Sequence, residues 1–498
     1  MAVKVDTWKE IIFGSSDPNI SRVLSKKEKD GELRKVAPRI YTTNLVDSLE
    51  NIVRRNLMDI LVYRYPDAII SHRSAKEMRP TATGDFFLTN STTRRVTDLP
   101  GIILNFVKGP KASPHDIPFM GMHISGEHRY MLENMQMSRK SGDASRVLPI
   151  SVIENKLEQI LLTGGEDRLN EYRDELRTVA EELGMQTEFA KINSIISALL
   201  STHDAKVLST DSAKALAVGN PFDKTRVELF EVLFEAIKDR YFVIRNNRNT
   251  DEDSFRLFSF FESYFSNYIE GTEFEIDEAK AIVDSGIPMP RRDEDSHDIL
   301  GTFKVLSNRA EMMKTPTSPK ELFSILSHRH SILLEGRPHM NPGIFKTKNN
   351  RAGMTEFVDY QLVKGTLSQG FKYYAALTDP FARAIFMMFM ISEVHPFNDG
   401  NGRLARVMMN AELVRADQSR IIVPTVFRED YILALRKLTR HKDPLAYINV
   451  MTKLHQFSDN LYGTDFTELK NYLAACNAYE EPSQAKLQII DRSVFPAF

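Results

Sequence analysis

The sequence predicts a mainly α-helical protein that begins with a small α+β domain. From about residue 150 onward, apolar residues recur at the three- and four-residue spacing of amphipathic helices. Residues 1–150 instead carry short apolar runs separated by turn-forming residues, which is typical of short strands. With 42% hydrophobic and 27% charged residues, the 498-residue chain has the composition of a globular protein of roughly two to four domains.

Composition also excludes several classes of protein. The 65 basic residues nearly balance the 67 acidic ones, which argues against a surface built throughout to wrap nucleic acid. Cys476 is the single cysteine, so neither an intrachain disulfide nor a Cys-rich zinc site can form. The first residues show no secretory signal, and the most apolar stretch, residues 384–394, is shorter than the roughly 20 residues that cross a bilayer. These features predict a cytoplasmic protein with no membrane partner.

The N-terminal module is assigned to residues 1–150. A helix is predicted at residues 19–29, followed by Gly31 and a strand at 39–43. This order occurs in winged helices that bind DNA, but it is also the commonest way to enter a small sheet, and we favour the second interpretation. Further strands are predicted at residues 67–72, 84–89 and 99–108.

Residues 151–218 are predicted to be a helical connector. Its helical periodicity places four apolar side chains on one face: Ile153, Leu157, Ile160 and Leu161. More helices are predicted after it, at residues 223–241 and 253–269 and from residue 277 to a Pro-rich break at 286–290. Residues 291–297 are polar and charged, which predicts a loop.

Residues 395–406 carry the clearest chemical signal, His-Pro-Phe-Asn-Asp-Gly-Asn-Gly-Arg-Leu-Ala-Arg. Pro396 must end the apolar helix at 380–394, because proline lacks a backbone donor and clashes with the preceding turn. The Gly-rich turn that follows leads into a new helix, and the N–H groups of such a turn form a nest for anions. Arg403 and Arg406 share one face of that helix and can both reach a polyphosphate.

Two more side chains complete the requirements of phosphate chemistry. Asp399 offers a hard carboxylate oxygen to Mg2+, and His395 can accept a hydroxyl proton at neutral pH. An EF-hand loop does not fit, because the sixth residue from Asp399 is Leu404, and a Walker A loop would need Lys and Ser or Thr after Gly402. A plain helix-turn-helix explains the glycines but not the charged residues. The segment therefore predicts a phosphoryl-transfer site.

This segment resembles the signature of the Fic family, His-x-Phe-x-(Asp/Glu)-Gly-Asn-Gly-Arg-x-x-Arg, at every fixed position. The resemblance implies an all-helical core with a β-hairpin flap over residues 219–425, followed by a helical extension at 426–498 packed on it. It also implies transfer of AMP from ATP to a Tyr, Ser or Thr hydroxyl of a protein. His395 would deprotonate that hydroxyl and Asp399 would hold Mg2+. The nucleotide and its phosphates would contact the remaining motif residues: Phe397, which anchors the loop, Asn398, Gly400, Asn401, Gly402, Arg403 and Arg406.

A second motif, Ser-Asn-Tyr-Ile-Glu-Gly at residues 266–271, resembles the inhibitory signature (Ser/Thr)-x-x-x-Glu-(Gly/Asn) of the same family. It ends a predicted helix at 253–271, on which Ser266 and Glu270 share a face. The resemblance implies that Glu270 pairs with Arg406 in place of the γ-phosphate, because one arginine cannot serve both anions. This predicts an autoinhibited adenylyltransferase. In an alternative, Glu270 positions water and the enzyme removes AMP from a modified protein.

The flap is predicted before the catalytic helix. Residues 342–346, Pro-Gly-Ile-Phe-Lys, resemble a family stretch that precedes the flap, and residues 354–358 would form a flap strand. A strand edge can align the backbone of a target by strand addition. Three residues are therefore candidates for target docking: Thr355, Glu356 and Phe357.

The N-terminal module resembles the opening of AbiE-type antitoxin regulators. The likeness rests on residues 31–43, Gly-Glu-Leu-Arg-Lys-Val-Ala-Pro-Arg-Ile-Tyr-Thr-Thr, and residues 70–75, Ile-Ser-His-Arg-Ser-Ala. It implies a targeting or regulatory module. It also supports a second alternative, a DNA-binding regulator from a toxin-antitoxin or phage-defence pair whose Fic core senses nucleotide. Self-modification and a homodimer are compatible with the adenylyltransferase interpretation, and DNA as a partner stays open.

Overall fold

The computed structural model describes residues 9–200, 205–353 and 355–494. Met354 of the predicted flap strand, residues 201–204 of the predicted connector and residues 495–498 of the predicted C-terminal extension lie outside the described residues. The chain divides into two compact units, Met1–Val218 and Gly219–Phe498, each with its own hydrophobic core. In the described part of the chain, no helix combines the length and apolar character needed to cross a membrane.

The first unit opens with a three-stranded antiparallel sheet in the order β1-β3-β2. Helix α1 (Pro18–Lys29) follows β1 and confirms the helix predicted at 19–29. It begins where Asp17 accepts a hydrogen bond from the Asn19 N–H and Pro18 sets the first turn. Within residues 9–48, α1 is the one helix, so this part lacks the helix pair of a helix-turn-helix. The three strands are β1 (Ile11–Phe13), β2 (Arg34–Ala37) and β3 (Ile40–Thr42).

A six-stranded mixed sheet follows, in the order β6-β7-β5-β4-β9-β8. The predicted strands at 84–89 and 99–108 correspond to β5 and β7, which pair in parallel. The strand predicted at 67–72 is shorter, because the chain leaves the sheet where the His72 N–H donates to the buried Glu133 carboxylate. The elements are α2 (Leu49–Arg55), α3 (Leu57–Arg64), β4 (Ile69–Ile70), α4 (His72–Glu77), β5 (Asp85–Asn90), β6 (Arg94–Leu99), β7 (Ile102–Lys108), β8 (Ile117–Phe119), β9 (Met122–Ile124) and α5 (Glu127–Glu133).

Helices α6 (Ile150–Leu183), α7 (Gln186–Leu199) and α8 (Asp211–Ala217) complete the first unit. The predicted apolar face of α6 is turned inward, since Ile153 and Leu157 are fully buried. Gly165, with φ of 74°, kinks α6 at a conformation that suits glycine. These helices share a hydrophobic cluster with residues from α5.

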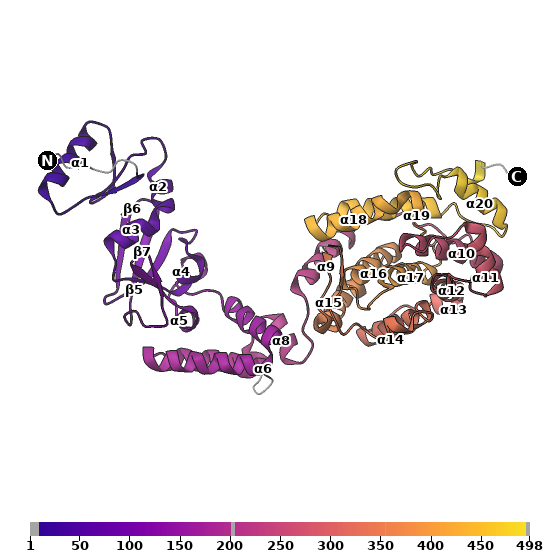
Figure 1. Cartoon of the computed structure of the whole chain (residues 1–498), viewed down its shortest axis with the longest axis horizontal. Helices are drawn as coiled ribbons and strands as arrows, with labels where there is room; N and C mark the ends of the chain where they lie inside the picture. Colours follow the sequence, from indigo (N-terminus) through magenta and orange to yellow (C-terminus); the bar gives the residue numbers. More distant parts are fainter. Residues whose placement is uncertain (1–8, 201–204, 354, 495–498) are drawn as a thin grey trace. The chain divides into compact units, whose positions relative to one another are not determined.

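The second unit is almost entirely helical, which confirms the predicted mainly α fold (Figure 1). The prediction of a loop at 291–297 is wrong, because α12 begins at Asp293. The three carboxylates of its first turn are favourable there, since they lie at the positive end of the helix dipole. The elements are α9 (Lys224–Ile237), α10 (Glu252–Ile269), α11 (Ile276–Ser285), α12 (Asp293–Leu306), α13 (Arg309–Met312), α14 (Pro319–Leu333), β10 (Arg351–Ala352), β11 (Thr355–Glu356), α15 (Val363–Ala376), α16 (Pro380–Val394), α17 (Asn401–Arg415), α18 (Arg428–His441), α19 (Pro444–Ser458) and α20 (Phe466–Ala475).

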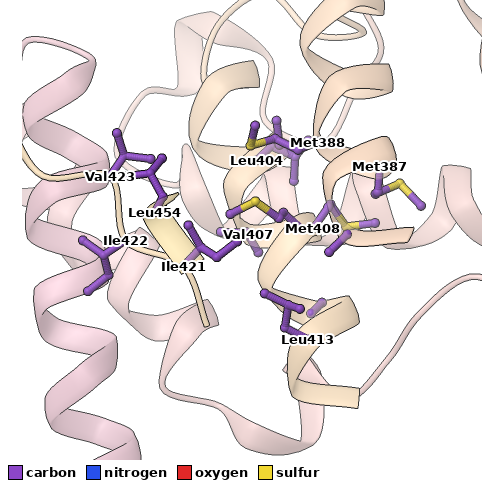
Figure 2. Close-up of a cluster of buried hydrophobic side chains, with 14 of the residues drawn as sticks. Met387, Met388, Leu404, Val407, Met408, Leu413, Ile421, Ile422, Val423 and Leu454 are labelled. Carbon is purple, nitrogen blue, oxygen red and sulfur yellow. The ribbon is translucent and has the colours of Figure 1, made fainter. Parts of the chain in front are cut away.

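Helix α16 lies at the centre of this unit and is apolar on every side, as expected of a fully buried helix. It packs against α17, and their side chains share one core with residues 421–423 and with α19 (Figure 2). The core residues labelled in the close-up are Met387, Met388, Leu404, Val407, Met408, Leu413, Ile421, Ile422, Val423 and Leu454. This packing fixes the connection between α16 and α17, which carries residues 395–400.

Candidate active site

The connection between α16 and α17 is a tight, preshaped loop. His395 and Gly400 both adopt left-handed backbone conformations, with φ of 47° and 72°. A Cβ on Gly400 would collide with Leu334, so glycine is required there for two reasons. The Asn401 side chain then clamps the turn, because its Oδ1 accepts from the Phe397 N–H and its Nδ2 donates to the Phe397 carbonyl, both at 2.9 Å.

His395 has the protonation state of a general base. Its Nδ1 lies 2.5 Å from the Ser392 carbonyl oxygen, which can only accept, so Nδ1 carries the proton and Nε2 has the lone pair. Burial lowers the pKa of His395 to about 4, which keeps the imidazole neutral at pH 7. The ring of Phe357 stacks on the imidazole at a centroid distance of 3.4 Å. His395 can therefore accept a proton at Nε2 beneath an aromatic cover.

Phe397 is fully buried and anchors the loop on a histidine that the sequence analysis missed. Its ring stacks on His330 from α14, at 3.8 Å between centroids. The Gly343 N–H donates to His330 Nδ1, so Nε2 carries the proton and donates to the Asp399 carbonyl at 3.0 Å. His330 thus fixes both the floor and the backbone of the catalytic loop.

The Pro-Gly-Ile-Phe-Lys stretch fastens the same loop from its other side. The Lys346 backbone N–H donates to the Pro396 carbonyl at 2.9 Å, and its buried ammonium donates to Asn350 at 2.7 Å. Asn350 in turn donates to the Phe397 carbonyl at 2.9 Å. Burial lowers the pKa of Lys346 to about 8. The stretch therefore supports the catalytic loop in addition to leading into the hairpin.

The hairpin is short, with Arg351 opposite Glu356 and Ala352 opposite Thr355. Glu356 is exposed, whereas Phe357 turns inward onto His395. Arg226 donates to the Glu356 carbonyl at 2.5 Å, which ties the hairpin to α9.

Arg406 and Glu270 form an ion pair in which the arginine is buried and the glutamate reaches the surface. Arg406 Nη2 donates to Glu270 Oε1 at 2.7 Å, and the same guanidinium donates to the side chain and the carbonyl of Ser266, both at 2.9 Å. Burial opposes the charge of Arg406, but Glu270 raises its pKa above the ordinary value. A Cβ on Gly402 would collide with the Glu270 carboxylate, which therefore lies directly on the first turn of α17. A negative charge thus lies against the N-terminal turn of α17.

Arg403 is held by partners from two other helices. Its Nη1 lies 2.9 Å from Asp298 Oδ1 of α12 and 3.2 Å from Asn267 Oδ1 of α10. Asp298 also accepts from Arg337 at 2.7 Å, so one buried carboxylate serves two arginines. Arg403 Nε is buried without a hydrogen-bond partner in the described part of the chain, which leaves a donor for a phosphate oxygen.

A third buried cluster joins the helix of Glu270 to α17. Glu262 accepts from Asn410 at 2.6 Å and pairs with Arg420 at 3.1 Å. Burial raises the pKa of Glu262 to about 7 despite these partners. The cluster fixes α10 against α17 two turns before Glu270.

Asp399 is the carboxylate available to a divalent cation. Its side chain is 43% exposed and lies 3.9 Å from Arg403, while the Asn398 amide points to the Met340 carbonyl. Among the described residues, no group of three or more His, Cys, Asp or Glu side chains gathers as a metal site. A single carboxylate fits Mg2+ when the substrate's phosphates supply further ligands.

One segment of the chain, which carries part of this site, matches a known family. Residues 323–413, which include the catalytic loop, match the model of the Fic/DOC family. This part of the chain is a Fic domain.

Two named relatives are similar over that region. The protein adenylyltransferase fic-1 of Caenorhabditis elegans is 26% identical over 231 residues, 45% of this chain and 45% of the relative. The protein adenylyltransferase Fic of Nematostella vectensis is 25% identical over 214 residues, 40% of this chain and 47% of the relative. The chain thus spans about half the length of the curated relatives it matches. A solved structure of C. elegans Fic-1 has 15% identity and a TM-score of 0.36, covering 66% of this chain and 94% of the other.

Proposed function

We propose that this protein is an autoinhibited protein adenylyltransferase, which transfers AMP from ATP to a Tyr, Ser or Thr hydroxyl of a target protein. The observation that carries the proposal is the Glu270 carboxylate, which lies against the first turn of α17 and pairs there with Arg406. A helix N-terminus that holds one anion in this way is suited to phosphate. The names of the relatives support AMP transfer as the reaction.

In the proposed reaction, His395 Nε2 takes the proton of the target hydroxyl. The hydroxyl oxygen forms a bond to the α-phosphorus of ATP, the bond to the bridging oxygen breaks, and diphosphate leaves. Arg403 donates to the phosphates, and the N–H groups at Gly400–Gly402 face them. Asp399 would hold Mg2+, which would neutralise charge on the diphosphate.

In the inhibited state, Glu270 competes with the γ-phosphate for Arg406. Three of the five N–H donors of the guanidinium already serve Ser266 and Glu270. Removal of the carboxylate would make Arg406 available to the nucleotide. In the alternative, Glu270 positions water for removal of AMP, and its loss would abolish activity.

Target docking is proposed for the hairpin. The short strand at Thr355 and Glu356 would offer an edge for strand addition, next in sequence to the Phe357 ring that covers His395.

We also propose a division of the chain. Residues 219–425 would be catalytic, with residues 426–498 packed on them, and residues 1–150 with the connector 151–218 would be regulatory, in a cytoplasmic protein. DNA binding, self-modification and a homodimer stay predictions.

The reaction is tested with ATP labelled at either the α- or the γ-phosphate. Two variants, Glu270→Gly and the double variant Glu270→Gly/His395→Ala, are each incubated with labelled ATP, Mg2+ and cell lysate. The proposal expects protein labelling from the α position only, lost with His395→Ala and kept in a matched His339→Ala control, whose side chain is exposed. Labelling from the γ position would show phosphate transfer instead, and labelling that survives His395→Ala would contradict the proposed base.

A further inference from the structure

The six-stranded sheet of the N-terminal module has a hollow on the face turned away from its main core. Phe86 and Leu88 of β5 point into that core, so Phe87 points to the opposite face. The strand register places Asn105 of β7 beside Phe87, and Arg95 of β6 beside Asn105. Together with the segment 137–146, these residues line a hollow of about 750 Å³.

The hollow gathers positive charge. Five of its lining residues are cations: Arg94, Arg95, Arg139, Lys140 and Arg146. The first four are exposed, and Lys140 lies 3.6 Å from the Asp85 carboxylate. More positive charge than negative therefore faces this space.

Arg146 is the cation that the structure satisfies least. Its Nη2 donates to the Met137 carbonyl at 2.7 Å, but its Nε is buried without a hydrogen-bond partner in the described part of the chain. Burial, and then the nearby charge of Arg139, lower the pKa of Arg146. Both effects mean that an anion placed between the two arginines would be stabilising.

The two strands give the hollow an apolar floor at Phe87 and Val107, beside the polar Asn105. The volume falls within the range of roughly 300–1,000 Å³ that small-molecule sites occupy. A hollow cannot enter a groove of duplex DNA, which admits a protruding helix or ribbon. We propose that this hollow binds a nucleoside polyphosphate, with its ring on the apolar floor and its phosphates on Arg95, Arg139 and Arg146.

The test uses the full chain with Arg403→Ala and Arg406→Ala, which disable the anion nest of the Fic domain. ATP is titrated by calorimetry at low salt, with inorganic tripolyphosphate and a short DNA duplex as comparison probes. We expect one binding site for ATP. Its affinity for ATP should fall at least tenfold in the double variant Arg95→Glu/Arg139→Glu. Both side chains are exposed, so the fold should persist. The matched control is Arg22→Glu, an exposed arginine of α1, which should leave binding unchanged.

Photolabelling supplies a second readout on the unmodified protein. An azido-substituted ATP should label a peptide from residues 87–107 or 137–146, in addition to any label near the catalytic loop. Absence of that label, or ATP binding that the double charge reversal leaves unchanged, would overturn the proposal. Tighter binding of the duplex than of ATP would also overturn it, in favour of a nucleic-acid surface. Because these readouts do not depend on AMP transfer, they stand apart from the proposed reaction.

Discussion

Asp298 should stabilise the positions of Arg403 and Arg337 in the folded protein, and Asp298→Asn tests this directly. The carboxylate is 3% exposed, pairs with Arg403 at 2.9 Å and accepts from Arg337 at 2.7 Å. Asparagine keeps the shape of the side chain but removes its charge, so two arginines would face a neutral amide. Arg403 is itself only 3% exposed, so its charge would lose its buried counter-charge.

The size of the effect follows from this burial. Breaking a buried ion pair costs about 3–5 kcal/mol, because the remaining charge is left uncompensated. The amide still accepts one hydrogen bond, so we take the lower end, about 3 kcal/mol. At roughly 2–4 °C per kcal/mol for a unit of this size, the Tm should fall by about 6–12 °C.

Thermal unfolding followed by circular dichroism measures this loss. The matched control is Asp295→Asn, whose carboxylate is 35% exposed, pairs with Arg292 at 3.1 Å and lies 3.5 Å from Arg337. Its substitution should cost less than about 1 kcal/mol. Mg2+ and ATP should restore part of the loss in Asp298→Asn, because phosphate can neutralise Arg403. Equal Tm values for the two variants would refute the role assigned to Asp298.

Three further predictions concern histidines. First, burial lowers the pKa of His330 and of His455 to about 4, below the value near 6.5 in the unfolded chain. Between about pH 6.5 and pH 4 the unfolded chain therefore binds more protons than the folded one, so the free energy of unfolding falls as the pH falls. Urea unfolding at pH 7 and pH 5 should show a loss of about 2 kcal/mol per histidine, and equal stability at the two pH values would contradict this prediction. Second, His330→Phe keeps the ring stack on Phe397 but removes both hydrogen bonds of the imidazole. In the Glu270→Gly background, kcat should therefore fall about tenfold with little change in KM. An unchanged kcat would count against a positioning role for His330. Third, because the pKa of His395 is about 4, kcat/KM of Glu270→Gly should stay flat from about pH 8 to 6, whereas a halved rate near pH 6.5 would indicate an ordinary histidine.

The catalytic loop was predictable because its residues are contiguous. Pro396 and the glycines dictate the turn, and the loop's His, Asp and Arg residues indicate phosphate chemistry without knowledge of the rest of the fold. The mainly α architecture was predictable for a similar reason, since helical periodicity is a local property.

The supporting residues could not be predicted, because packing brings them from distant helices. His330 precedes the loop by more than 60 positions, and an aromatic stack on Phe397 has no sequence signature. Asp298 directly follows the acidic stretch 291–297, where charge suggested a loop although three of the carboxylates suit the first turn of α12. Solvated and buried carboxylates look alike in sequence, and only the tertiary fold separates them.

The central claim is that Glu270 restrains AMP transfer by holding Arg406. The most direct test is the rate at which label passes from α-labelled ATP to one target protein. This rate is compared among wild type, Glu270→Gly and Glu273→Gly, a control at an exposed glutamate. A charge-assisted hydrogen bond of about 1.5–3 kcal/mol predicts a rate roughly tenfold to a hundredfold higher in Glu270→Gly, with the control equal to wild type. A rate that stays equal or falls in Glu270→Gly would contradict the claim. If wild type also removed AMP from a modified target and Glu270→Gly did not, the reaction would run in the opposite direction.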